Sequence, residues 1–403
     1  MNSCTEVNTF AVNKKREKRV QVFIALYFLS VLLPTTGKLI FVRPILCLLM
    51  YLMDSSYLSH RFSVRRDMFF FFATWFLCVA FGQIVIVGKP HINSLIHEFQ
   101  RIIMYFVIAL PLGRIKLNRK ELYIMSSALL IFNFTIQILE LLNIQWVFDF
   151  IKTYYYTGED MRHLNLALNQ TLTTFRSGSI FINPNVYCPI ALFCMAIQFF
   201  AIEKKILQGE HITVLNYLIL FIGSASLLLT GSRTALLALG VLMALFAAKV
   251  FHKRPLLVSI MGVIGICVIF RLVRMDARAI MISAGMDDSF GTKISEFARY
   301  LREVNPISYI IGNNSNIGSL EWGFDFEWGY VFVYTGIIGT VNYLKLHKKL
   351  IARHRGEHNP ELYKYVLFAL LCESMSATVL FNSYAYPLLA LFVFSEGVYD
   401  EQS

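Results

Sequence analysis

Long apolar runs separated by short polar turns repeat along the chain and predict membrane-spanning helices. A bilayer core of about 30 Å is crossed by about 20 apolar residues in a helix. We predict twelve such runs, at residues 20–36, 38–54, 68–88, 95–113, 121–142, 186–203, 212–230, 233–251, 255–273, 328–346, 362–382 and 384–399. No small-residue cleavage site lies between the basic N-terminal segment and the first run, which favours a first span over a removed signal peptide.

Some runs leave the number of crossings open. The second contains Arg43 before Pro44, and we expect this arginine near the outer interface because a charge at mid-bilayer costs about 2.5–3.5 kcal/mol on insertion scales. The last two runs are joined only by Asn382 and Ser383, which is typical of a helical hairpin. Eleven or thirteen crossings are therefore alternatives to twelve.

Basic residues predict how the spans are oriented. Every second turn carries Lys or Arg, from Arg61 and Arg65 near the start to the cluster between Lys345 and Arg355. Such turns stay on the cytoplasmic side of a membrane. We therefore expect both termini in the cytoplasm and two long loops, Asn143–Ile182 and Arg271–Glu327, outside.

The composition excludes an ordinary soluble domain. Hydrophobic residues make up 56% of the chain and charged residues 16%, with a mean hydropathy of +0.57. One core cannot bury so many apolar side chains. Because much of the net charge of +11 lies in the short turns, nucleic acid is not an expected partner. The seven cysteines form no disulfide pattern, and no repeat or linker divides the chain. We predict that residues 1–403 form a single all-α polytopic membrane domain.

Arginines in the first external region are candidate anion ligands. Arg162 lies within the first long loop, Arg176 opens the stretch Arg176–Asn185 that leads into the next run, and Arg233 lies in a very short turn. Asn183 and Asn185 are suited to capping the helix that follows. Two simpler interpretations stay open: Arg176 is a solvated residue of a re-entry turn, and Arg233 is a headgroup anchor.

The second external loop adds more cations than its side of the membrane normally carries, namely Arg274, Arg278, Lys293, Arg299 and Arg302. We expect an anionic partner, and a diphosphate is favoured because guanidinium groups bind phosphate oxygens in bidentate geometry.

The same loop ends in acids and aromatic residues over 321–328. Trp322 and Trp328 could stack on sugars, and Asp325 or Glu327 could orient or deprotonate a sugar hydroxyl. An interfacial aromatic belt with solvated acids is the alternative.

The order of these segments resembles the O-antigen polymerase and ligase superfamily. Arg176–Asn185 and Gly231–Gly240 are similar to paired signatures of that family. Later segments are similar to its large external loop and the span after it: Asp288–Lys293, Asn305–Asn313, Asp325–Gly329 and Thr335–Gly339. The resemblance covers about residues 176–339.

The resemblance implies an architecture similar to the C-type membrane glycosyltransferases, acting on undecaprenyl diphosphate-linked glycans. Arg176 and Arg233 match arginines that the family places near the lipid diphosphate. Asp325 stands where ligases have a functional histidine, which favours a polymerase. Lys293 stands where an arginine is expected, and lysine lacks the planar fork of arginine.

We therefore expect an enzyme that polymerises O-antigen or capsule repeat units on the outer leaflet of a bacterial cytoplasmic membrane. Glu327 is favoured as the group that acts on the acceptor hydroxyl, with Asp325 holding the loop. Expected partners are the lipid-linked glycans and membrane lipids, with a chain-length regulator as a further candidate. No cofactor is expected, since the lipid diphosphate is already activated. A ligase that transfers glycan to a lipid A core is one alternative. A lipid-linked oligosaccharide flippase is another, and it should carry intramembrane charges and broken helices.

Overall fold

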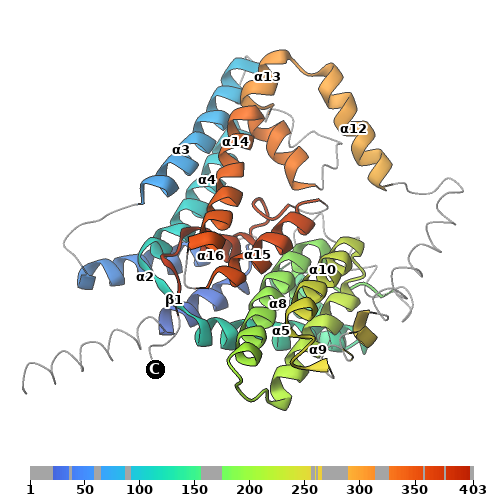
Figure 1. Ribbon diagram of the computed structural model, residues 1–403. Helices are drawn as coiled ribbons and strands as arrows, with labels where there is room; N and C mark the ends of the chain where they lie inside the picture. Colours follow the sequence, from blue (N-terminus) through green and yellow to red (C-terminus); the bar gives the residue numbers. More distant parts are fainter. Residues whose placement is uncertain are drawn as a thin grey trace, which may run out of the picture.

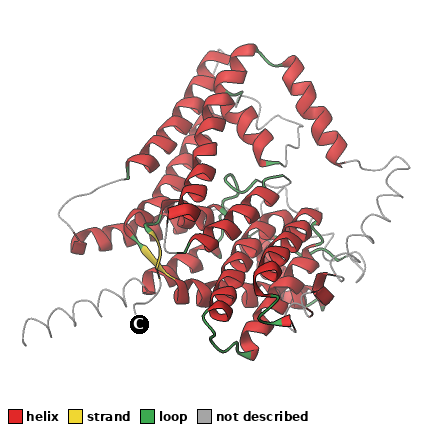
Figure 2. Cartoon of the chain, viewed as in Figure 1, coloured by secondary structure: helices red, strands yellow, loops and turns green. Residues whose placement is uncertain are grey.

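A computed structural model describes residues 21–35, 39–58, 65–86, 92–155, 175–255, 259, 262–265, 289–313, 326–356, 359–375 and 378–399, and most of them are helical (Figure 2). The elements in chain order are Gln21–Val31, α2 (Val42–Leu58), α3 (Arg66–Phe81), η2 (Gly82–Ile86), α4 (Ile92–Ala109), η3 (Leu110–Arg114), β1 (Lys116–Asn118), α5 (Arg119–Leu141), α6 (Gln145–Tyr154), η5 (Ser179–Phe181), α8 (Pro184–Leu207), α9 (Val214–Thr230), α10 (Arg233–Val250), α12 (Ser289–Glu303), α13 (Pro306–Ile311), α14 (Glu327–Gly356), α15 (Pro360–Glu373), α16 (Tyr386–Phe394) and β2 (Gly397–Tyr399).

Five helices in the described part of the chain are long and apolar enough to cross a membrane: Arg66–Val85, Leu95–Gly113, Arg119–Leu141, Pro184–Leu207 and Arg233–Val250. They coincide with five of the predicted runs. The fold is therefore that of a mostly helical chain with several candidate membrane spans.

The helices form two packed groups (Figure 1). In one group α3, α4 and α14 lie side by side, and in the other α8 packs against α5, α9, α10 and α15. Helix α14 also packs on α15 and joins the groups.

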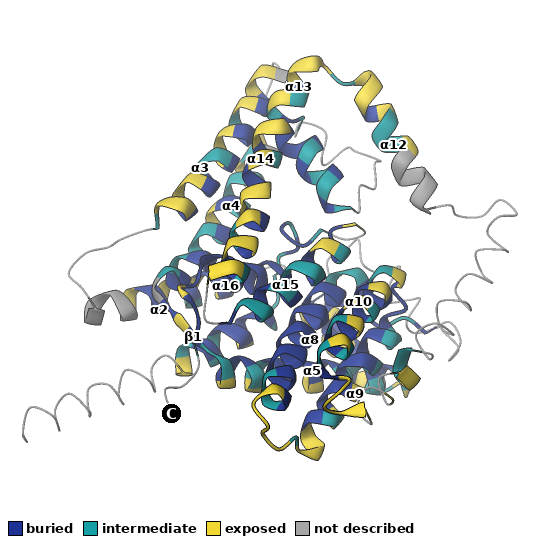
Figure 3. Cartoon of the chain, in the orientation of Figure 1, coloured by how far each residue is buried: buried dark blue, intermediate teal, exposed yellow. Residues whose placement is uncertain are grey.

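Helix α8 lies at the centre of its group, with 89% of its apolar window buried against 33–44% for the other four candidate spans (Figure 3). Those four expose large apolar side chains such as Phe69, Leu77 and Phe132. Such exposed faces fit contact with lipid.

The predicted span over 328–346 is not one continuous helix, because α14 is broken at Gly336. A straight helix would separate residues 328 and 343 by about 22 Å, yet the ring centroids of Trp328 and Tyr343 lie 5.3 Å apart. The backbone at Gly336 has φ 62° and ψ −163°. A Cβ there would lie 2.5 Å from the Ile310 carbonyl carbon, so only glycine fits against α13.

The last two predicted runs, 362–382 and 384–399, are also not full crossings. Helices α15 and α16 have 14 and 9 residues, fewer than a bilayer core requires. Residues 374–375 and 378–385, which lie between them, are not helical. The run 255–273 lies largely outside the described residues.

Arg43, which was expected near the outer interface, is buried inside the protein with 1% exposure. Its guanidinium donates to the carbonyls of Ser30, Val31 and Leu33 at 2.6, 3.1 and 2.8 Å, and also to that of Ser383. These acceptors replace the water that the charge has lost.

The basic turns predicted to be cytoplasmic meet at one end of the molecule. Lys249 pairs with Glu203 at 2.9 Å and with Glu361, and Lys204 donates to Asn359 at 2.6 Å. At the same end β1 and β2 pair in parallel, with Lys116 opposite Gly397. We call this the β1–β2 end.

Candidate functional site around Arg176

A short irregular segment, Phe175–Asn183, is buried between helices at the other end. It has no room for a side chain at Gly178, where a Cβ would lie 2.5 Å from the carbonyl of Ile182. Ser179 and Ile182 have positive φ values of 55° and 61°. The Asn183 side chain accepts from the Asn185 backbone N–H at 2.9 Å and caps α8, as the sequence predicted. The segment is thus a tight re-entry turn.

A polar stripe on α5 binds this turn. Asn133, Gln137 and Glu140 are buried and follow helical spacing on one face. Asn133 accepts from the Ser179 hydroxyl at 2.8 Å, and Gln137 donates to the Ser177 carbonyl at 3.5 Å. Glu140 accepts from the Ser177 hydroxyl. Non-helical backbone at membrane depth needs such partners, because lipid supplies none.

Arg176 lies directly against the turn that carries Arg233. Its Nε donates to the Thr230 carbonyl at 3.3 Å. At Gly231, where φ is +61°, a Cβ would lie 3.0 Å from Cγ of Arg176. The next residue, Ser177, donates its backbone N–H to Leu229 at 3.0 Å. The structure therefore brings together the two predicted arginine segments, which are more than fifty residues apart in sequence.

The two arginines differ in their settings. Arg176 is half-buried, whereas Arg233 is exposed at the start of α10, where the Ser232 side chain caps the helix. Both have polar or electrostatic partners. Arg233 is the more accessible of the two to a ligand outside the helices.

Glu373, which the sequence analysis missed, is a buried carboxylate at the end of α15. It ends α15 with 1% exposure, and among the described residues its Oε1 has no hydrogen-bond partner. Glu373 and Arg176 both lie within electrostatic range of the Cys188 thiol. The sequence signal that could have identified Glu373 is a carboxylate within the apolar run 362–382.

Glu327 is fully buried and anchors the chain after α15. Its carboxylate accepts from the backbone N–H groups of Leu380, at 2.7 Å, and of Val379. Its own N–H donates to the Ser374 carbonyl at 2.9 Å. Both oxygens of the predicted catalytic group are thus engaged by backbone.

Trp328 lies beside Glu327 but points into the protein. Its Nε1 donates to the Ser374 hydroxyl at 2.8 Å, and its ring packs on Tyr343 and His347. A sugar would have to displace one of these contacts to stack on the indole.

Among the other predicted ligands, one side chain is described, and it lies on a different helix. Arg299 is exposed on α12, which packs on the first part of α14 through Phe297 and Tyr300. Lys293 lies in the same helix, but its side chain is outside the described set. Arg162, Arg278, Trp322 and Asp325 lie outside the described residues.

No group of three or more His, Cys, Asp or Glu side chains within the described residues is arranged to hold a metal ion. Comparison of the chain with protein-family models and with curated proteins finds no match to either.

Proposed function

We propose that this protein is a membrane enzyme that extends undecaprenyl diphosphate-linked oligosaccharides into a surface polysaccharide. The observation that carries the proposal is the contact of Arg176 with the Thr230–Gly231 turn, which leads into Arg233. It brings two arginine-bearing segments that are distant in sequence together at one end of the helices, where a lipid diphosphate could bind.

In this proposal Arg176 and Arg233 hold the diphosphate of the donor. When the glycan leaves, negative charge grows on the phosphate oxygens, and fixed cations stabilise that charge. Guanidinium groups suit this role because their paired N–H donors match two phosphate oxygens. Arg162, Arg278, Lys293 and Arg299 remain candidates for further contacts with the anion.

We propose Glu373 as the base that acts on the acceptor hydroxyl, with Glu327 or Asp325 as the second candidates. Among the described residues, Glu373 has an oxygen without a hydrogen-bond partner. A general base must reach the proton that it removes, and Glu327 would have to release a backbone donor to do so. The free oxygen of Glu373 among the described residues thus favours it.

The proposed setting is the bacterial cytoplasmic membrane, with the Arg176 end outside and the β1–β2 end in the cytoplasm. The meeting of the basic turns at one end supports this orientation, since basic turns stay inside. The sequence predicted twelve crossings. We propose fewer, because α14 is broken and because α15 and α16 are short.

A transporter of lipid-linked oligosaccharides is the second candidate, and two observations favour it. The side chains of Glu98 and Arg101 form an ion pair at 2.5 Å within α4 and are largely buried. Helix α14 is broken at Gly336. Intramembrane charges and broken helices are typical of transporters.

The experiment uses purified protein with a lipid-linked repeat unit, in detergent and in sealed vesicles. An enzyme makes a ladder of longer products in detergent, where no membrane separates two sides. A transporter makes no ladder and moves the lipid only in vesicles. A ligase would instead cap an added lipid A core.

Lysine variants test the arginine contacts within that assay. Arg176→Lys and Arg233→Lys keep the charge but lose the paired planar N–H donors of the guanidinium group. The polymerisation rate should therefore fall about tenfold or more. Arg254→Lys, at an exposed position near the β1–β2 end, is the matched control. Full ladders from both variants at equal protein levels would reject the diphosphate contacts.

A further inference from the structure

The buried side chain of Arg43 lies against the C-terminal end of helix Gln21–Val31. Its guanidinium donates to three carbonyls at or just after that end, at 2.6, 3.1 and 2.8 Å, which belong to Ser30, Val31 and Leu33. The last carbonyls of a helix have no partner within the helix and carry partial negative charge. Arg43 supplies both donors and a positive charge to this end, and so it caps the helix.

The same guanidinium also binds segment 378–385, which leads into α16. It donates to the Ser383 carbonyl, and its Cζ lies 5.2 Å from the centre of the Tyr384 ring. A guanidinium group above an aromatic face is attracted by the electrons of the ring. One side chain thus joins the end of helix Gln21–Val31 to the chain before α16.

Tyr384 connects Arg43 to the re-entry turn of the candidate site. The centroids of the Tyr384 and Phe181 rings lie 4.8 Å apart, with an angle of 66° between the ring planes. Both residues are buried. Phe181 belongs to the same turn as Arg176. Closely packed side chains transmit displacements to one another, so a shift of Arg43 should reach this turn through Tyr384.

Asn382 provides a second contact between segment 378–385 and the start of α8. Its side-chain amide donates to the carbonyl of Val186, in the first turn of α8, at 3.0 Å. Its side-chain oxygen accepts from the backbone N–H groups of Tyr384 and Ala385 at 2.9 and 3.1 Å. Segment 378–385 is therefore held by Arg43 on one side and by the region of the re-entry turn on the other.

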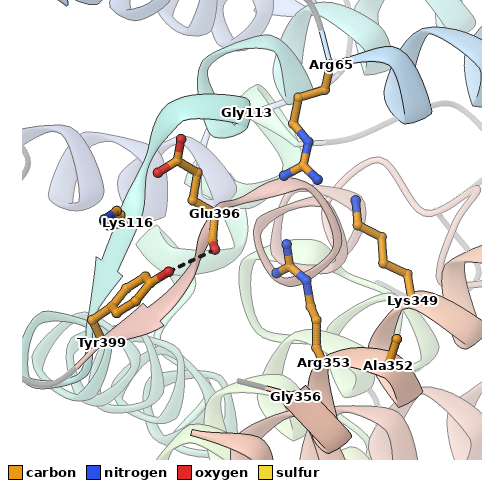
Figure 4. A pocket seen from close by; sticks show the side chains of 9 residues that line it. All are labelled: Arg65, Gly113, Lys116, Lys349, Ala352, Arg353, Gly356, Glu396 and Tyr399. Atoms are coloured by element: carbon orange, nitrogen blue, oxygen red, sulfur yellow. Dashed lines mark hydrogen bonds between the residues drawn. The ribbon is translucent and has the colours of Figure 1, made fainter. Parts of the chain in front are cut away.

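Guanidinium groups also bind the other end of α16. Arg65 and Arg353 donate to the carbonyls there, namely those of Phe392, Phe394 and Ser395. Figure 4 shows both guanidinium groups beside a cavity at the β1–β2 end. Burial lowers the pKa of the neighbouring Lys349 to about 8, whereas an arginine keeps its charge when it is buried. Arginine is thus the residue type suited to bind carbonyls inside this protein.

We propose that Arg43 is a positioning residue for Arg176, because its guanidinium fixes segment 378–385 and this segment fixes the re-entry turn. Four carbonyls from two segments accept its N–H groups and form a site for a planar guanidinium ion. Lysine has a compact ammonium group without planar paired donors, so Arg43→Lys should not hold both segments. The effect on polymerisation rests on the proposed function, whereas the guanidinium site does not.

Arg43→Ala, with and without added guanidinium chloride, tests this site in the full chain. Alanine leaves the carbonyls without their donor, so Tm should fall. A free guanidinium ion can take the vacant place, so Tm should rise again at concentrations well below those that unfold the parent chain. Sodium chloride at matched ionic strength is the reference. Arg254→Ala, at an exposed position, is the matched control, and guanidinium should not raise its Tm.

The polymerisation rate per folded molecule separates positioning from stability. It is measured with a lipid-linked repeat at a temperature at which every variant is folded. Arg43→Ala should lower this rate about tenfold or more, because a displacement of about 1 Å at a reacting group can cost about 10²-fold. Added guanidinium should restore the rate. If Arg43 only stabilised the fold, the rate per folded molecule would not change.

Tyr384 offers a matched pair of variants for the path from Arg43 to the turn. Tyr384→Phe keeps the ring and should keep the rate, whereas Tyr384→Leu removes the ring and should lower the rate as Arg43→Ala does. The double variant of Arg43→Ala with Tyr384→Leu should be about as slow as either single variant, since groups that act through one path are not additive. Equal rates in the two Tyr384 variants, or additive losses in the double variant, overturn the proposal.

The remaining outcomes also decide. A folded Arg43→Ala whose Tm does not respond to guanidinium refutes the guanidinium site. If Arg43→Ala does not fold even with guanidinium, the two Tyr384 variants decide the path. A parent chain that makes no ladder refutes the proposed function alone. In that case the Tm values decide the inference, because additive losses of Tm in Arg43→Ala and Tyr384→Leu would show that the two residues do not act together.

Discussion

Gly178→Ala tests whether the re-entry turn positions Arg176. A Cβ at this position would lie 2.5 Å from the Ile182 carbonyl carbon and oxygen, whereas ordinary contacts begin at 3.4 Å. The turn would have to open by about 0.9 Å, the difference of the two distances, and its partner is backbone that cannot rotate away. Overpacking of this kind costs about 1–3 kcal/mol, and we expect the upper part of that range.

The consequence for function follows from the position of Gly178, two residues after Arg176. Opening the turn moves Arg176 away from Thr230 and Gly231, so we expect the polymerisation rate to fall together with stability. The assays are unfolding by SDS in mixed micelles and ladder formation with a lipid-linked repeat. Gly240→Ala is the control, since no atom lies within 4 Å of a Cβ there and alanine favours the helix. Unchanged stability in Gly178→Ala would refute the account of the turn.

Three further predictions concern buried polar groups. Gln137→Leu leaves the Ser177 carbonyl without this donor and should lower the free energy of unfolding by about 1–3 kcal/mol, measured in the same micelles. An unaltered free energy of unfolding would show that the polar stripe does not stabilise the turn. Glu327→Gln places an amide against two backbone donors, so Tm should fall even without substrate; a normal Tm with no ladder would instead restore Glu327 to catalysis. The pKa of Lys349 is about 8 in the folded state and 10.5 in its usual range, so the unfolded chain binds more protons between these values and stability should rise with pH there. Lys349→Gln should flatten that rise. An identical pH profile in the variant would show that Lys349 does not cause it.

The apolar runs were predictable because hydropathy reports length and composition directly. The positions of α3, α4, α5, α8 and α10 follow from the sequence to within a few residues. The adjacency of Arg176 to the Gly231 turn was also anticipated, through the resemblance of the two segments to paired signatures.

The break in α14 could not be predicted from its own residues. The apolar pattern continues through Gly336, and glycine is tolerated within membrane helices. The reversal depends on close contact with Ile310 and Gly312 of the preceding segment, which is tertiary information. The α5 stripe, in contrast, was visible as Asn133, Gln137 and Glu140 at helical spacing in an apolar run.

Several buried charges in the described part of the chain have compensating partners, whereas one oxygen of Glu373 has none there. Glu140 accepts from the Ser177 hydroxyl, Glu327 accepts from two backbone N–H groups, and Arg43 donates to carbonyls. Glu373 keeps an oxygen without a partner among the described residues. An uncompensated buried carboxylate is costly, so selection for stability alone would replace it with a neutral residue.

Glu373→Gln therefore separates the enzyme from the transporter. Glutamine keeps the size of the side chain and removes the base, so an enzyme should lose ladder formation in detergent by about 10²-fold or more while still binding the lipid-linked repeat. A transporter that protonates Glu373 should instead lose the dependence of lipid movement on a pH gradient in vesicles. Glu210→Gln, at an exposed turn, is the matched control. A full ladder from Glu373→Gln in detergent would exclude Glu373 as the base and return that role to Glu327 or Asp325.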